Sequence, residues 1–133
     1  MPLEIEVSWE GGQRFLARSG SNELRLDSDA QAGPSPVQAL AMALAGCMAI
    51  DVVHILTKGR HEPRGLRAHL EADRAPTEPK RILAVRLRFS ITGDATADQV
   101  ERAIALSREK YCSVWHSLRQ DIAFETSFTI DPA

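Results

Sequence analysis

A chain of 133 residues with 44% hydrophobic and 26% charged side chains has the size and composition of one soluble domain. We therefore predict a single domain over residues 1–133. The formal net charge of −2 provides none of the basic excess that nucleic-acid binding requires. The first residues show no basic stretch followed by an apolar run, so we expect no secretory signal and a cytoplasmic protein.

Three strands are predicted at the start of the chain. Residues 3–9 alternate between apolar and polar side chains, which is the period-two pattern of a half-buried strand. The Gly-Gly pair at 11–12 predicts a turn, and residues 13–18 and 23–27 are shorter strand candidates.

A long helix is predicted next. Ser35 is its N-cap, Pro36 suits its first position, and Gln38 completes a capping-box signature. The pattern continues to Lys58, and Gly59 is a typical residue for the C-terminal stop.

The helix is apolar on most of its faces, so we expect protein to surround it on nearly all sides. Gln38, Asp51 and His54 interrupt the apolar run, and an Asp near the middle of a membrane span is costly. We therefore favour a buried helix in a soluble protein over a membrane segment. Small side chains along the helix would let another backbone approach closely: Ala41, Ala43, Ala45 and Gly46.

The second half of the chain repeats the alternation of strand and helix. Residues 66–72 and 83–91 alternate as two strands of a hairpin with a long loop. A second helix begins near Thr96, and residues 122–130 form a last strand. The inner stripe of the second helix is predicted to be Val100, Ala103, Ile104 and Ser107. The order β-β-β-α-β-β-α-β predicts an α+β fold with mainly antiparallel sheet and a long buried central helix.

The two cysteines, Cys47 and Cys112, are the candidate reactive groups. Two distant thiols make neither a structural disulfide framework nor a standard zinc site. Cys47 lies about three turns into the helix, beyond reach of the positive end of the dipole, so its ionisation needs a cation from another segment. Asp51, one turn onward on the same face, would oppose ionisation if it points at Cys47 and nothing neutralises it. The alternative for each cysteine is an inert core thiol.

Two histidines fall near the cysteines in sequence. His54 lies two turns after Cys47, which is long for a nucleophile and base pair, and His116 is close enough in sequence to touch Cys112. A metal site made of these four residues has no standard ligand spacing, so no metal is predicted.

Two segments, residues 33–53 around Cys47 and residues 106–114 around Cys112, resemble the two cysteine motifs of the OsmC/Ohr family. The turn at residues 9–12, the strand and helix order and both cysteine positions also match, so the resemblance covers essentially the whole chain. Residues 50–60 and 109–112 are most similar to the OsmC-like branch, known mainly as uncharacterised redox proteins.

The resemblance implies an intertwined homodimer whose central helices pack together, with two active sites at the subunit interface. It implies a peroxidase that reduces organic hydroperoxides. Cys47 would become a sulfenic acid, Cys112 would form a disulfide with it, and a dithiol reductant of the dihydrolipoyl type would reopen the bond. No cofactor is implied.

The family also uses an Arg from the N-terminal strands and a Glu early in the central helix. Arg14 is the nearest match for the Arg, with Arg18 as the second choice, and it would supply the cation that Cys47 needs. Val37 occupies the Glu position, next to Gln38. Two other functions stay open: a small-molecule-binding module with ancillary thiols, and a thiol redox sensor that reacts with a different electrophile.

Overall fold

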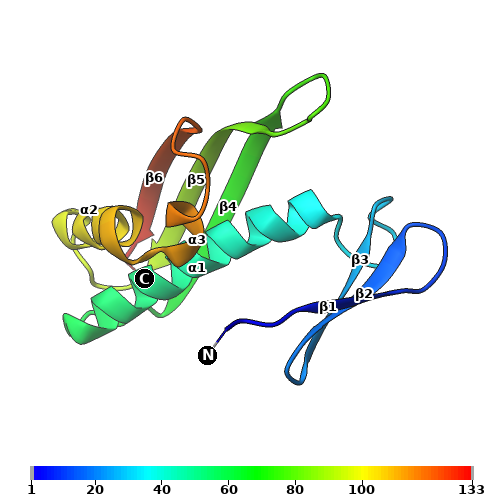
Figure 1. Ribbon diagram of the computed structural model, residues 1–133. Coiled ribbons are helices and arrows are strands. Elements are labelled where there is room, and N and C mark those ends of the chain that lie inside the picture. The colour runs from blue at the N-terminus through cyan, green and yellow to red at the C-terminus, as the bar shows by residue number, and fades with distance from the viewer. Residues whose placement is uncertain (1, 133) are drawn as a thin grey trace. The chain divides into compact units, whose positions relative to one another are not determined.

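The computed structural model describes residues 2–132. Its elements in chain order are β1 (Glu6–Trp9), β2 (Arg14–Ser19), β3 (Asn22–Asp27), α1 (Pro36–Lys58), β4 (Gly65–Arg74), β5 (Ile82–Thr92), α2 (Ala97–Leu106), the π-helical turn η1 (Ser107–Tyr111), α3 (Ser113–His116) and β6 (Ala123–Asp131) (Figure 1). The predicted α+β order is confirmed, and the short α3 follows Cys112. The chain forms two compact units, residues 1–42 and 43–133, and α1 begins in the first and continues in the second.

The first unit contains the antiparallel sheet β1-β2-β3. Gly11 and Gly12 adopt φ of 104° and 55° between β1 and β2, a backbone conformation that side-chain-bearing residues rarely adopt. The indole N–H of Trp9 donates to the Gly12 carbonyl at 2.9 Å and closes the turn. The predicted turn at Gly11 and Gly12 is therefore confirmed.

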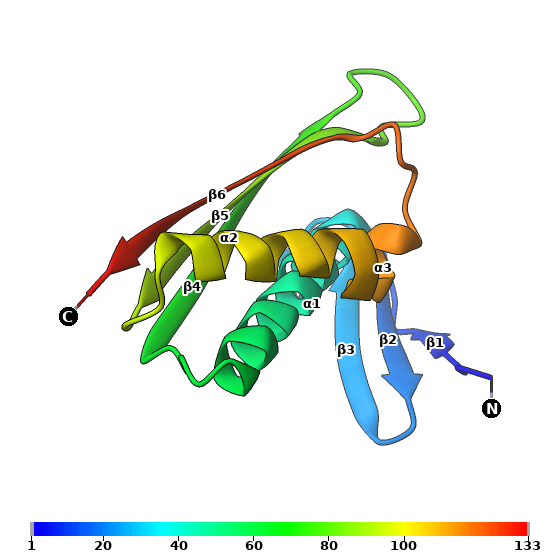
Figure 2. The ribbon, with the colours of Figure 1, turned by 90° about the vertical axis from the view of Figure 1, so that its left-hand side faces the viewer.

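The second unit contains the sheet β4-β5-β6. Strands β4 and β5 are antiparallel, whereas β5 and β6 are parallel, so the sheet is mainly antiparallel with one parallel pair. Helices α1 and α2 cover the same face of this sheet (Figures 1 and 2). The predicted inner stripe of α2 and the following residue is buried. The core between the helices and the sheet includes Leu44, Met48, Val52, Val85, Leu87, Phe89, Val100 and Ala103.

Helix α1 begins as predicted. The Ser35 Oγ accepts the Gln38 backbone N–H at 3.1 Å, and the Gln38 side chain accepts the Ser35 N–H at 3.0 Å. This reciprocal capping box satisfies two of the helix's free backbone donors. The observed role of the Gln38 side chain is therefore to cap α1.

The burial of α1 differs from the prediction. Only one stripe with four-residue spacing is fully buried: Leu44, Met48, Val52 and Leu56. Ile50 is 70% exposed, and Met42 and Val53 are exposed as well. Ala45, Ala49 and Ile55 are partly buried against the core, but the helix is not buried on nearly all sides, contrary to the prediction from the sequence.

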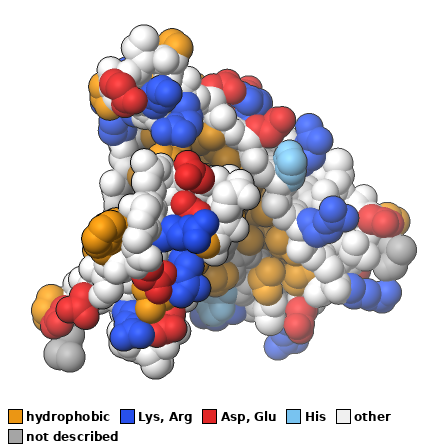
Figure 3. Space-filling view, turned by 90° about the vertical axis from the view of Figure 1, so that its right-hand side faces the viewer, with side chains coloured by type: hydrophobic (Ala, Val, Ile, Leu, Met, Phe, Trp, Pro, Cys, Tyr) orange, Lys and Arg blue, Asp and Glu red, His pale blue; other side chains and the backbone are white. Residues whose placement is uncertain are grey.

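The composition of α1 also meets the length and hydropathy expected of a membrane span. Its mean hydropathy reaches 2.1, and 22% of that stretch is buried. Because the buried stripe forms the core against a sheet and a second helix, we assign α1 to the core of a small soluble domain. Hydrophobic side chains reach the surface between charged ones on the face in Figure 3.

Candidate active site

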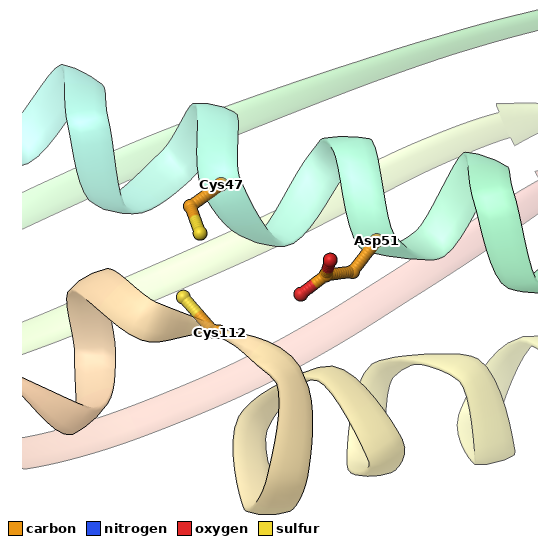
Figure 4. A group of neighbouring side chains, drawn as sticks. All are labelled: Cys47, Asp51 and Cys112. Carbon is orange, nitrogen blue, oxygen red and sulfur yellow. The ribbon is translucent and has the colours of Figure 1, made fainter. Parts of the chain in front are cut away.

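The side chains of Cys47, Asp51 and Cys112 converge in the second unit. Their sulfur atoms and a carboxylate oxygen all lie within 4.8 Å of one another. Figure 4 shows both sulfurs pointing toward each other and the carboxylate pointing toward the same space. Both cysteines are free thiols. The fold therefore joins two residues whose proximity no sequence spacing could establish.

The π-helical turn η1 positions Cys112. The backbone N–H of Cys112 donates to the Ser107 carbonyl at 2.7 Å, which closes the wider turn. Cys112 then caps α3, where its Sγ accepts the Trp115 N–H at 3.3 Å. π-Helical turns are rare and often occur at functional sites.

An aromatic cluster packs beside α3. The rings of Trp115 and Phe124 lie 4.6 Å apart, and the Arg108 guanidinium lies 4.6 Å from the Phe124 ring centre. The His116 ring pairs with the Arg108 carbonyl at 2.9 Å. These contacts hold α3, and with it Cys112, against β6.

The two thiols differ in their access to solvent. Cys47 is half-buried, whereas Cys112 is 0% exposed. Burial, together with the neighbouring Cys47 thiol, raises the pKa of Cys112 from 9.0 to about 11, although the Trp115 N–H acts in the opposite direction. Cys112 is therefore a protonated thiol at neutral pH, and Cys47 is the thiol that a solute can reach.

A hydrogen bond from the π-helical turn η1 holds the Asp51 side chain. The Ser107 hydroxyl donates to the Asp51 Oδ2 at 2.8 Å, and Ser107 is fully buried. The expectation that Asp51 shares a face with Cys47 is confirmed. The Ser107 contact was not predicted, because only the fold brings η1 against α1.

Arg14 lies in the first unit, on β2. Its Nε donates to the Asp27 Oδ2 at 3.2 Å, with the Arg14 side chain 52% exposed. Asp27 is 2% exposed, and backbone N–H groups from the following loop (Ala32 first, then Asp29) lower the pKa of its carboxyl. Arg18, the second choice, pairs with Glu23 at 2.7 Å. The approach of Arg14 to Cys47 stays a prediction.

Sequence reasoning missed the role of Asp27. The Asp accepts N–H groups from Asp29, Gln31 and Ala32, so it organises the loop that follows β3. An Asp at a strand end before a small, polar segment is typical of such a loop, and this signal was present in the sequence.

The histidines lie outside this site. His54 is exposed on α1, and the His116 ring is bound to the Arg108 carbonyl. The described side chains close enough to share a metal ion are instead the two cysteines and Asp51. The four-residue cysteine and histidine set weighed from the sequence is therefore not assembled.

The family follows from a comparison of the sequence. A sequence profile described as OsmC, OsmC-like protein, matches residues 27–127, which includes both cysteines. The chain belongs to the OsmC family. This OsmC-family chain is also 35% identical to Protein YhfA of Escherichia coli K12 over 131 residues, covering 96% of this chain and 98% of YhfA.

Solved structures agree with this membership. A hypothetical protein from Aquifex aeolicus VF5 superposes on the OsmC-family chain with a TM-score of 0.91 at 25% identity, covering 98% of this chain and 97% of that one. A protein from Legionella pneumophila, described as an organic hydroperoxide resistance protein OsmC, superposes with a TM-score of 0.71 at 17% identity, covering 97% of each chain. The second likeness shows a shared fold.

Proposed function

We propose that this OsmC-family protein is a cytoplasmic, homodimeric, thiol-dependent peroxidase that reduces organic hydroperoxides. Cys47 attacks the peroxide and becomes a sulfenic acid, and Cys112 then displaces the oxygen to form a Cys47–Cys112 disulfide. A dithiol reductant reduces that disulfide. The observation that carries the proposal is the pair of facing thiols, one accessible and one buried, within 4.8 Å.

The different burial of the two thiols supports their different roles. An attacking thiol must meet a peroxide, which suits half-buried Cys47. A resolving thiol only has to meet the oxidised partner, which suits buried Cys112. The name of the Legionella protein, organic hydroperoxide resistance protein, supports the substrate class.

A cation for Cys47 is proposed to come from Arg14. The groups that converge on Cys47 in the second unit are a thiol and a carboxylate, and neither carries a positive charge. A free thiol becomes reactive when a cation lowers its pKa. Arg14, already oriented by a carboxylate, is the proposed source in the dimer.

The homodimer is supported by the open faces of α1. Ile50 and its exposed apolar neighbours lie on the same helix as Cys47. A Cβ added at Gly46 would meet nothing within 4 Å, so a second helix has room to approach there. A second copy of the chain would cover these faces next to the thiols.

The experiment is an intact-mass and thiol count before and after a small excess of cumene hydroperoxide. We expect the loss of two thiols with no added oxygen, and continued hydroperoxide consumption when a dithiol is present. Cys47→Ser should abolish both. Thiols that stay reduced while a small molecule co-purifies would favour a binding module. A disulfide that forms fastest with a different oxidant would favour a redox sensor.

A further inference from the structure

We propose that Asp51, positioned by Ser107, is the base that removes the thiol proton of Cys112 as Cys112 attacks the Cys47 sulfenic acid. The inference rests on the proposed peroxidase cycle and assigns a residue to its second step. A carboxylate oxygen of Asp51 lies within 4.8 Å of both sulfurs, close enough for transfer through one water or after a small side-chain rotation.

The second step needs a base because Cys112 is protonated at rest. With a pKa of about 11, roughly one Cys112 in 10⁴ is a thiolate at pH 7. The thiolate is the nucleophile in disulfide chemistry, so an unassisted Cys112 would attack slowly. A nearby carboxylate that takes the proton during the attack removes this limit.

Asp51 places a carboxylate, not a cation, beside the two thiols, so it does not supply the positive charge that makes a thiol reactive. What a carboxylate can do here is accept a proton. The carboxylate is close to the one proton that has to move when the disulfide forms.

Ser107 ties the base and the thiol together. Its hydroxyl holds the Asp51 carboxylate at 2.8 Å, and its carbonyl accepts the Cys112 N–H at 2.7 Å. Ser107 itself is fully buried, so its own atoms in both contacts are shielded from solvent. A single residue of η1 thus sets the position of Asp51 relative to Cys112.

The groups around the two thiols include one carboxylate, Asp51, that can accept a proton. Among the described His, Cys, Asp and Glu side chains, the group that converges here is the two thiols and Asp51. Arg108 of η1 is engaged over the rings of Phe124 and Trp115. The core side chains of the neighbouring strand β5 are uncharged: Val85, Leu87, Phe89 and Ile91.

The step balances without any other reactant. Asp51 takes the proton from the Cys112 S–H group, and the Cys112 sulfur forms the S–S bond with Cys47 while the S–O bond of the sulfenic acid breaks. The departing hydroxide takes the proton back from Asp51 and leaves as water. The sum is one sulfenic acid and one thiol giving one disulfide and one water, with Asp51 unchanged.

The test compares Asp51→Asn with the wild type in a single turnover with cumene hydroperoxide. Asn keeps an oxygen that can accept the Ser107 hydrogen bond but cannot take a proton. We expect the Cys47 sulfenic acid to form, to accumulate and to be trapped by dimedone, while disulfide formation slows by about 10²-fold or more. Asp98→Asn, an exposed charge removal on α2, should leave both rates unchanged.

The pH profile separates a proton-transfer role from a structural one. Without the base, the Asp51→Asn rate should rise about tenfold per pH unit toward pH 11, because Cys112 then has to ionise by itself. The wild-type rate should be nearly flat around neutral pH. Equal rates, or parallel profiles in the two proteins, would overturn the proposal.

A second measurement keeps the inference distinct from the peroxidase activity. Cys47 is converted to a mixed disulfide with 5-thio-2-nitrobenzoate, and its displacement by Cys112 is followed by the colour released. This reaction uses the same proton removal but no peroxide, so it reports on Asp51 even if the wild type reduces no hydroperoxide. Ser107→Ala should slow it, and Ser107→Thr should restore the rate.

Discussion

The Arg14 guanidinium is held by Asp27, a buried carboxylate directly opposite it on the neighbouring strand β3. The family resemblance implies a Glu early in α1 for this purpose, at the place where the chain has Val37. The chain therefore offers Arg14 a carboxylate from a different element. This makes Asp27 the first residue to test in the N-terminal unit.

Asp27→Asn should lower the melting temperature of the N-terminal unit, because Asn replaces a charge that accepts three loop N–H groups and the Arg14 side chain. The pKa of Asp27 is lowered by folding, so its stabilisation is present above the ordinary value of 3.8 and is lost as pH falls through the lower folded value. The difference from wild type should therefore shrink in strong acid. Glu23→Gln, which breaks the exposed pair with Arg18, is the control and should have little effect.

The reduced protein should lose stability between pH 9 and pH 11. Folding raises the pKa of Cys112 from 9.0 to about 11, so in that range the unfolded chain releases a proton that the folded chain keeps. The stabilisation is complete below pH 9 and disappears as pH rises through the folded value. Denaturant unfolding at several pH values measures this slope. If the free energy of unfolding of Cys112→Ala falls as steeply with pH, the loss of stability does not come from Cys112.

Cys112→Ser should allow the first step, oxidation of Cys47, and block the second step, formation of the internal disulfide. The variant keeps accessible Cys47, so without a reductant it should stop at the Cys47 sulfenic acid, which dimedone traps, whereas the wild type goes on to the disulfide. Excess hydroperoxide should carry its Cys47 to the sulfinic acid, which adds two oxygens to the intact mass. Accumulation of the same sulfenic acid in the wild type would rule out the internal disulfide.

Ile50→Glu should convert the protein to a monomer if a second copy covers α1. Ile50 is 70% exposed in the single chain, so a charge there leaves the core unchanged, whereas it would be buried against a partner helix. Light scattering should give the mass of two chains for the wild type and of one chain for the variant. Arg88→Glu, on strand β5 outside this face, is a control that should stay dimeric. A wild type that is monomeric at micromolar concentration would contradict the proposed homodimer.

Gly33→Ala should destabilise the protein by about 1–3 kcal/mol. A Cβ at Gly33 would overlap the backbone carbonyl of Arg25, so the loop after β3 would have to move. Gly65→Ala is the matched control, because its Cβ would make only an ordinary contact with Thr92 and should change stability by less than about 0.5 kcal/mol. Urea unfolding of both variants checks the pair.

Local patterns predicted most of the elements. Period-two alternation located β4, β5 and β6 to within two residues or so, and the two capping boxes located the starts of α1 and α2. These features depend on neighbours within a few positions, so the sequence carries them directly. Of the N-terminal strands, β2 and β3 lie within one residue of the prediction, whereas β1 begins at Glu6 and not at Leu3 as predicted.

Features that depend on distant segments were not predicted. The parallel pairing of β6 with β5 and the contact of Ser107 with Asp51 both arise from packing between elements. The one-sided burial of α1 differs from the expectation because composition measures how apolar a helix is and cannot say which faces find a neighbour. The loop role of Asp27 was local but was overlooked.

The five residues from Ser107 to Tyr111 form one wide turn that ends at Cys112, and this has a consequence for comparing relatives. Losing one residue there would tighten the turn to an ordinary helix and rotate the following thiol by about 100° around the axis. Both cysteines would still be present, but the second would face away from the first. Segment length between the serine and the cysteine is thus as informative about chemistry as the presence of the cysteine itself.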